Sequence, residues 1–197
     1  MDHRQRLSRT DMQDRILNTA DELFRQFGMK KTTVADIAAR LAVSPAYIYR
    51  FFPSKDAIIA AHAERVSAEL LRRLQEVVGG PGSATERLTG LVATTIDYNR
   101  EYIARHGEAY KLYVTSVEQN WDCVRVFIAA LVRMLEDVVI QGIESGEFHS
   151  TDPAGTALVL HDCLKGVLHP LALERAPSEE VARRAQAMIA FLIKALR

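Results

Sequence analysis

The sequence is poor in the residues and runs that mark several classes of protein. It has only two cysteines in 197 residues, Cys123 and Cys163, which lie far apart and match no zinc or CxxC spacing. Small buried thiols in a reducing compartment are therefore expected. No apolar run approaches the ~18 residues of a membrane span, and the N-terminal stretch MDHRQRLSRT is polar and unlike a signal peptide. These absences favour a cytoplasmic protein that does not interact with membranes.

Motifs of common enzyme classes are also missing. The chain contains no GxSxG, HExxH, GxxxxGK[ST] or GxGxxG pattern. His161, Cys163 and His169 are near one another in sequence, but His161 and Cys163 are two positions apart and would diverge on a helix. Zinc ligands on a helix are favoured at spacings of three or four. We therefore expect no catalytic residues, no metal and no cofactor.

Net charge is zero, with 25 basic and 25 acidic side chains, but the charges are unevenly distributed. Residues 1–55 carry ten Lys/Arg and six Asp/Glu, a net charge of +4, which leaves −4 on the remainder. A basic N-terminal part on an acidic body indicates that the first part works near phosphate.

Sustained strand-like alternation is absent, and apolar residues recur at helical spacing along the whole chain. The sequence therefore predicts an all-α fold. Proline, glycine and capping residues divide it, because Ser44 can cap a helix that starts at Pro45, Pro53 must end it, and Pro170 should kink or break another. The expected helices span about 11–27, 33–41, 45–51, 54–78, 84–105, 108–116, 121–145, 153–175 and 178–196.

Two short helices at 33–41 and 45–51, joined by a tight turn and preceded by a longer helix, form a predicted helix-turn-helix. In such a unit the second helix enters the DNA major groove and its N-terminal residues reach base edges. Ile48 and Phe52 are four apart and are expected to face the core. The remaining faces would present to DNA Pro45, Ala46, Tyr47 and Arg50, with phosphate donors at Thr33, Ser44, Tyr49 and Lys55.

Three linked blocks carry a resemblance to a known family. They are ILNTADELFRQFG (16–28), TTVADIAARLAVS (32–44) and IYRFFPSKDAI (48–58), within the first third of the chain. In order and spacing they resemble the Tet-repressor (TetR/AcrR) transcriptional regulators. The resemblance implies phosphate contacts at Thr33, Ser44, Tyr49 and Lys55 and base contacts at Ala46, Tyr47 and Arg50. The basic cluster Arg4, Arg6 and Arg9 is either a disordered arm that touches the minor groove or phosphates, or a solvated tail, and both alternatives stay open.

The same resemblance implies two domains with different functions. Residues 1–55 would form the helix-turn-helix domain, and residues 56–197 a helical ligand-binding and dimerisation domain. A homodimer through the last two helices would bind an inverted-repeat operator in double-stranded DNA, and a small organic effector would release this repressor. Candidate pocket residues, chosen for their amphipathic or apolar side chains, are Tyr98, Tyr102, Tyr110, Trp121, Phe127 and His161.

The recognition segment departs from the family pattern at two positions. The family often has glycine where this chain has Ala46, and tyrosine or histidine where it has Phe51, whose ring cannot donate a hydrogen bond. A second interpretation therefore stays open, in which the chain is a helical small-molecule-binding or catalytic protein whose N-terminal part no longer binds DNA. Salt-dependent binding to DNA separates the two, because phosphate contacts weaken as salt rises.

Overall fold

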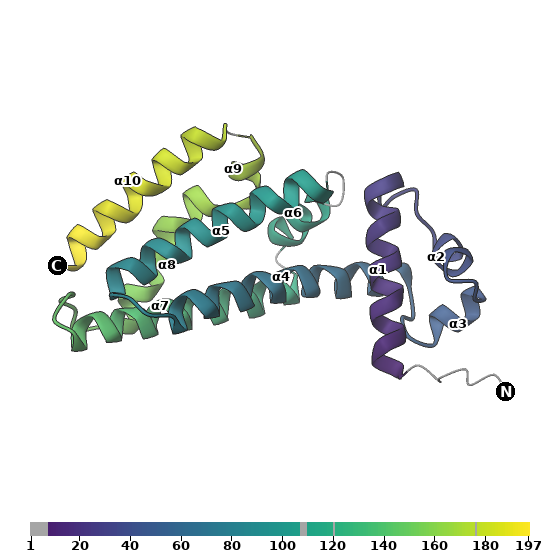
Figure 1. Ribbon diagram of the computed structural model, residues 1–197, viewed down its shortest axis with the longest axis horizontal. Coiled ribbons are helices and arrows are strands. Elements are labelled where there is room, and N and C mark those ends of the chain that lie inside the picture. The colour runs from purple at the N-terminus through teal and green to yellow at the C-terminus, as the bar shows by residue number, and fades with distance from the viewer. Residues whose placement is uncertain (1–7, 107–109, 120, 176) are drawn as a thin grey trace.

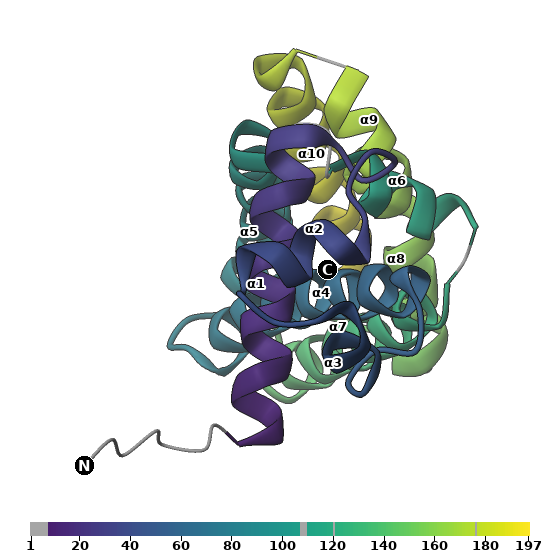
Figure 2. The same cartoon turned by 90° about the vertical axis from the view of Figure 1, so that its right-hand side faces the viewer.

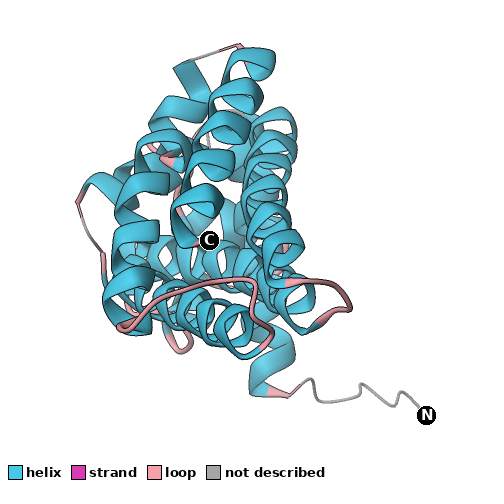
Figure 3. Ribbon diagram, turned by 90° about the vertical axis from the view of Figure 1, so that its left-hand side faces the viewer, coloured by secondary structure: helices cyan, strands magenta, loops and turns pink. Residues whose placement is uncertain are grey.

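A computed structural model describes residues 8–106, 110–119, 121–175 and 177–197. Within these residues the regular structure is helical and no strand occurs (Figure 3), as the sequence predicts. The helices are α1 (Arg9–Phe27), α2 (Val34–Arg40), α3 (Pro45–Tyr49), α4 (Lys55–Gly79), α5 (Ala84–His106), α6 (Tyr110–Glu118), α7 (Asp122–Glu144), α8 (Pro153–Leu168), α9 (Pro170–Arg175) and α10 (Ser178–Leu196).

Helices α1, α2 and α3 lie together at one end of the molecule, which we call the head (Figure 1). The head also includes the first turns of α4, because Ile58 is fully buried with the head's own apolar cluster. The body comprises the rest of α4 and α5 to α10, with a separate buried cluster that begins at Val66. Helix α4 therefore connects two hydrophobic cores as one continuous rod.

Helix α1 begins earlier than the sequence pattern suggests. Ser8 caps it, since the Ser8 hydroxyl accepts from the Asp11 N–H while the Asp11 carboxylate accepts from the Ser8 N–H, both at 3.0 Å. Arg9 is consequently the first residue of a helix and not part of an extended arm, which corrects that part of the prediction. Arg4 and Arg6 lie outside the described residues.

The turn between α2 and α3 is short, and both helices lie on the side of α1 that faces away from the body (Figure 1 and Figure 2). Thr33 and Asp36 form a capping box that starts α2, and Ser44 accepts from the Tyr47 N–H to start α3. Ala42 in the turn has φ of 55°, a left-handed conformation that is rare outside glycine. The chain thus turns sharply enough to set α3 at the outer surface.

The start of the long α5 is hydrogen-bonded to the segment that follows α7. At its start, the Glu147 carboxylate accepts hydrogen bonds from the Ala84 and Thr85 N–H groups, which satisfies donors that a helix leaves unpaired. Between α8 and α9 the helix breaks before Pro170, as predicted, because proline lacks the N–H that would continue the helix.

None of the helices in the described residues combines the length and apolar character needed to cross a lipid bilayer.

Candidate DNA-binding surface and effector cavity

Helix α3 presents a polar and aromatic face to solvent. Ile48 is fully buried in the head, whereas the side chains that share the other faces are exposed, among them Pro45, Ala46 and Arg50. Tyr49 is 50% exposed, which is unusual for a large aromatic side chain in a folded domain. The buried Ile48 agrees with the predicted inward face, and the exposed residues of α3 are those for which contact with DNA stays a prediction.

Tyr47 takes an intermediate position on α3. Its ring packs edge-on against Phe51 at 5.3 Å between centroids, and the Arg50 guanidinium carbon lies 5.6 Å from the Tyr47 ring centroid. Cation–π contact and ring packing hold the Tyr47 and Arg50 side chains next to each other. Phe51, which departs from the family pattern, thus serves as a packing surface for the candidate base-reading residues.

The four candidate phosphate donors differ in what they already bind. The Thr33 hydroxyl donates to the Asp36 carboxylate at 2.7 Å, so a phosphate contact would have to replace that bond. The Ser44 hydroxyl accepts from the Tyr47 N–H at 3.2 Å, which leaves its hydrogen out of that bond. Lys55 Nζ lies 3.4 Å from the Lys30 carbonyl oxygen, at the start of α4. Tyr49 and Ser44 are therefore the donors least committed to the fold.

Asp36 accepts from both the hydroxyl and the N–H of Thr33, and these hydrogen bonds hold the pKa of the Asp36 carboxyl below its ordinary value, with a smaller contribution from the Lys55 charge. The carboxylate therefore stays ionised beside the candidate phosphate contacts. The hydrogen bond to Asp36 orients the Thr33 hydroxyl at the edge of the candidate DNA-binding surface.

Head and body meet at a buried polar contact. His62 on α4 is 2% exposed, and its Nε2 lies 3.0 Å from the Tyr102 hydroxyl on α5 and 3.7 Å from Asp21 Oδ1 on α1. Nearby, Arg65 of α4 donates to the Asn18 side chain of α1 at 2.6 Å. These contacts join α4 to both the head helix α1 and the body helix α5.

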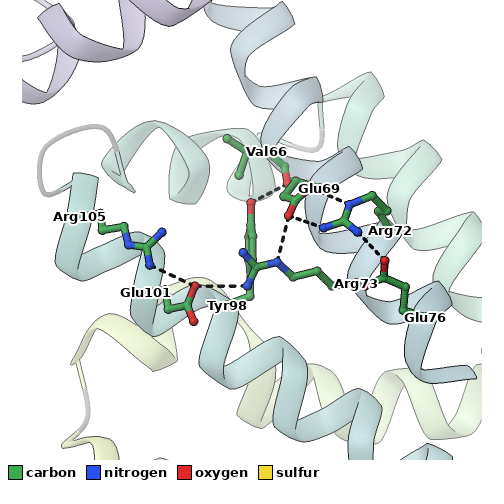
Figure 4. A network of polar contacts seen from close by, with 8 residues as sticks. All are labelled: Val66, Glu69, Arg72, Arg73, Glu76, Tyr98, Glu101 and Arg105. Carbon is green, nitrogen blue, oxygen red and sulfur yellow. Dashed lines mark hydrogen bonds and ion pairs between the residues drawn. The ribbon is translucent and has the colours of Figure 1, made fainter. Parts of the chain in front are cut away.

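A charged network continues along the same side of α4 (Figure 4). Arg73 pairs with Glu69 on its own helix at 3.0 Å and with Glu101 on α5 at 3.2 Å, while its guanidinium carbon lies 5.0 Å from the Tyr98 ring centroid. Hydrogen bonds from the two arginines Arg72 and Arg73 lower the pKa of Glu69 to about 2. The network therefore connects α4 to α5 through ionised groups.

Tyr98 packs against Arg73 of that network and is held by a hydrogen bond to α4. Its hydroxyl donates to the Val66 carbonyl oxygen at 2.9 Å (Figure 4), and burial raises the pKa of Tyr98 to about 12. Tyr98 and Tyr102 line a polar cleft of about 400 Å³ together with charged residues of α1, α4 and α5. The cleft is thus a polar joint and not an apolar ligand pocket.

A second cavity lies inside the body and has different chemistry. It measures about 420 Å³ and is enclosed by side chains of α4, α5, α6, α7 and α8. Its walls are predominantly aliphatic and aromatic, and include Leu70, Val92, Phe127, Leu131, Leu135 and Leu164. Polar groups are few, and the size and lining are typical of sites for small organic molecules.

The candidate pocket residues do not converge on one site. Phe127 and His161 line the apolar cavity, whereas Tyr98 and Tyr102 line the polar cleft. Tyr110 is 1% exposed and packs 6.1 Å from Tyr102 between ring centroids. Trp121 occupies the N-cap position of α7, and its indole N–H donates to the Gln119 side chain at 3.0 Å.

Lys165 and His169 line the cavity as well, although the sequence analysis did not select them. Their spacing was a usable signal, because Lys165 is four residues after His161 and His169 four after Lys165, and residues four apart lie on one face of a helix. Within the described residues, no three His, Cys, Asp or Glu side chains are grouped so that they could hold a metal ion. Cys123 and Cys163 are free thiols, and burial raises the pKa of Cys123.

The last long helices leave apolar side chains uncovered. Leu158 and Val159 of α8 are 54% and 59% exposed, and Phe191 of α10 is 69% exposed. Exposed apolar side chains gathered on one surface of a monomer mark interaction sites. A groove of about 440 Å³ between α8 and α10 is lined in part by Val159 and Ala195, so one of the three exposed side chains borders it.

Comparison with known proteins decides the family. Residues 84–189, more than half of the chain, match the family described as "Tetracyclin repressor-like, C-terminal domain". Residues 16–62 match "Bacterial regulatory proteins, tetR family". The chain belongs to the TetR family. It is a helix-turn-helix transcriptional regulator, and proteins of the TetR family are not enzymes, as the absence of catalytic motifs predicted.

Individual TetR relatives are distant. The transcriptional repressor KstR2 of Mycolicibacterium smegmatis is 26% identical over 139 residues, which are 68% of this chain and 66% of that repressor. The nucleoid occlusion factor SlmA of Haemophilus influenzae is 30% identical over 79 residues, covering 40% of this chain and only 36% of that factor. The chain thus spans little more than a third of the nucleoid occlusion factor that it matches.

Solved structures agree on the TetR fold. A TetR/AcrR-family regulator from Thermobifida fusca superposes with a TM-score of 0.69 at 25% identity, covering 95% of this chain and 99% of that one. SmeT, the repressor of a multidrug efflux pump in Stenotrophomonas maltophilia, superposes at 0.67 with 20% identity, covering 97% and 91%. In TetR proteins the helix-turn-helix binds DNA and the C-terminal domain typically binds a ligand and dimerises.

Proposed function

We propose that the protein is an effector-released repressor that binds an inverted-repeat operator as a homodimer. The observation that carries this proposal is α3, a five-residue helix whose outer face exposes Pro45, Ala46, Tyr49 and Arg50 at the far end of the head. Arg50 suits bidentate contact with guanine, and the Tyr49 hydroxyl suits a phosphate oxygen. Because such a regulator acts on DNA, the proposed location is the cytoplasm.

The proposed division of the chain follows residues 1–55 and 56–197. The first part would bind DNA and the second would bind effector and dimerise. Helix α4 is shared, since its first turn packs in the head through Ile58 and its later turns pack in the body. A displacement of α4 by a ligand would therefore move the head as well.

Dimerisation is proposed to occur through α8 and α10. Their exposed side chains Leu158, Val159 and Phe191 would be buried against the same residues of a second copy in a two-fold symmetric interface. A palindromic operator needs two heads related by such an axis. The exposed apolar side chains of these helices thus support the dimer that an inverted-repeat operator requires.

Effector control is proposed to work through the apolar cavity in the body. Ser67 and Leu70 of α4 line the cavity, and His62, one to two turns earlier on α4, contacts Tyr102 on α5 and lies near Asp21 on α1. A ligand that binds one arrangement of α4 and α5 better than another changes the separation of the two heads. A tight ligand that leaves operator affinity unchanged would contradict this mechanism.

The test is binding of the purified protein to tiled duplexes from around its own coding region, at two salt concentrations. We expect one short inverted repeat to bind two protomers with an affinity that falls steeply as salt rises. Equal, weak binding to every duplex would instead support the alternative that the head has lost DNA binding.

A substitution at Lys55 sharpens this test. Lys55→Gln removes one proposed phosphate contact per protomer, so the slope of log affinity against log salt should decrease by about 0.9 per protomer. Arg133→Gln, which removes an exposed charge from α7 in the body, is the matched control and should leave the slope unchanged. If Lys55→Gln also leaves both affinity and slope unchanged, Lys55 does not contact phosphate.

A further inference from the structure

The polar side chains of the apolar cavity are not evenly distributed. Three of them, His161, Lys165 and His169, belong to or directly follow α8 and are spaced four residues apart, so they form one stripe on the cavity wall. No aspartate or glutamate is found among the residues that line this cavity, all of which lie in the described part of the chain. Every ionisable side chain of the wall is therefore a base.

We infer that the effector is an organic anion with an apolar body, and that its anionic group binds at the α8 stripe while its hydrocarbon part fills the cavity. This inference rests on the proposed function, because it names the class of ligand for the proposed effector site. The chemistry fits a carboxylate on an aliphatic or aromatic skeleton, since the opposite walls offer Leu70, Val92 and Leu135.

Lys165 supplies the charge on which this selectivity depends. Lys165 is exposed although it lines the cavity, as expected of a lysine whose methylene stem borders an apolar space and whose ammonium group lies at the mouth. An anionic head group at the mouth would pair with Lys165 and keep partial access to water. A ligand cation would instead meet a like charge, and a neutral head group would leave the ammonium without this partner.

His161 adds a second nitrogen deeper in the wall. Its side chain is 14% exposed, and Nδ1 lies 3.2 Å from the Asp162 carboxylate, which is itself 73% exposed. That contact leaves Nε2 as the nitrogen that the ring offers to a ligand. Asp162 partly offsets the positive charge of a protonated His161 ring from outside the cavity, so the preference for an anion depends mainly on Lys165.

The negative end of the α8 dipole lies close to the same stripe, because the helix ends at Leu168. It opposes an anion, and Lys165 in the last turn compensates for it. Removing the Lys165 charge should therefore abolish the preference for anions and not merely weaken it. Substitution of Lys165 alone therefore tests the proposed preference for anions.

The experiment uses two matched ligand series and isothermal titration calorimetry on the intact chain without DNA. One series is decanoate, decanol and decylammonium, and the other is 2-naphthoate, 2-naphthalenemethanol and 2-naphthylmethylammonium. In at least one series the carboxylate should bind about tenfold more tightly than the alcohol, and more tightly still than the ammonium compound. Equal or tighter binding of the alcohol or the ammonium compound in both series overturns the inference, as does no binding by any member.

Substitutions separate this result from general loss of the cavity. Lys165→Met should weaken carboxylate binding about tenfold and leave alcohol binding unchanged within a factor of two, whereas Lys165→Arg should restore the carboxylate. Arg133→Met, on the outer side of α7, is the charge-matched control. Unchanged carboxylate affinity in Lys165→Met would overturn the inference.

Operator binding without ligand keeps the two proposals distinguishable. Lys165 lies in the body, so Lys165→Met should bind the operator as the unmodified chain does. An operator complex together with no anion preference would reject the inference and leave the regulator. Anion preference in calorimetry without any operator complex would reject the regulator and leave the ligand class.

Discussion

Ala42 adopts an unfavourable backbone conformation that sets the position of the recognition helix α3. Its φ of 55° lies in the left-handed region, where an alanine costs about 1–2 kcal/mol relative to a right-handed conformation. The same turn lets the Val43 N–H reach the Ala38 carbonyl oxygen at 3.0 Å and sets the start of α3. The backbone geometry, and not the alanine side chain, is what the head needs there.

We therefore predict that Ala42→Gly stabilises the protein. Relief of left-handed strain should exceed the extra entropy of glycine in the unfolded chain, for a net gain of about 0.5–1 kcal/mol in the free energy of unfolding. Urea unfolding measures the change. Ala39→Gly, at an exposed helical position of α2, is the control and should lose about 1 kcal/mol. A destabilised Ala42→Gly variant would show that the turn is not strained.

At the scale of elements, α4 and α5 are joined by polar contacts along the side that faces α1. His62 and Tyr102 meet at 3.0 Å near the head, and Arg73 reaches Glu101 further along (Figure 4). In the proposed mechanism, these links would carry a change in the body cavity to α1. The strength of the Arg73–Glu101 link should depend on the ionisation of Glu69, which pairs with Arg73.

The pKa of Glu69 predicts a pH dependence for this joint. Because the folded-state pKa of about 2 is below the ordinary value of 4.5, the ion pairs stabilise the protein fully above pH 4.5 and their contribution disappears as pH falls towards 2. Glu69 is 39% exposed, so water screens the pairs and the contribution is about 1 kcal/mol or less.

Glu69→Gln should accordingly lower the free energy of unfolding near pH 7, with a difference from the unmodified chain that shrinks between pH 4.5 and 2. Urea unfolding at a series of pH values measures it. Glu76→Gln, which removes the more exposed partner of Arg72, is the control and should change stability by a few tenths of a kcal/mol. A difference that is constant with pH would exclude an electrostatic origin.

On the scale of the whole molecule, the head lies at one end and the α8–α10 surface belongs to the body (Figure 1). Phe191 is the most exposed large apolar side chain of that surface, at 69%. A buried aromatic residue near a two-fold axis contributes strongly to an interface, and each substitution acts twice in a symmetric dimer. Phe191 is therefore the residue at which the proposed dimer can be tested.

We predict that Phe191→Glu weakens dimerisation at least 100-fold, because two charges would be buried without partners. Sedimentation velocity over a range of protein concentrations measures the effect, and operator affinity should fall with it. Val126→Glu is the matched control, since Val126 is 66% exposed on α7, outside α8 and α10. Equal effects of the two substitutions would place the interface elsewhere.

The sequence by itself determined the local features of this protein. Capping residues such as Ser44, the break at Pro170 and the spacing of apolar residues specify helix boundaries within a few positions, because these effects act between neighbours along the chain. The same local pattern placed Ile48 inward and Arg50 outward on α3. Both the all-α fold and the TetR family followed from such short-range information.

Only the tertiary structure decided which distant residues meet. It separated Tyr102 from Phe127, which the sequence had grouped in one pocket, and it brought Lys165 to the cavity and Glu147 to the start of α5. Cavities are formed by helices that are far apart in sequence, and their positions depend on how every core side chain packs. Periodicity along one helix specifies an inward face, but it does not specify what that face will meet.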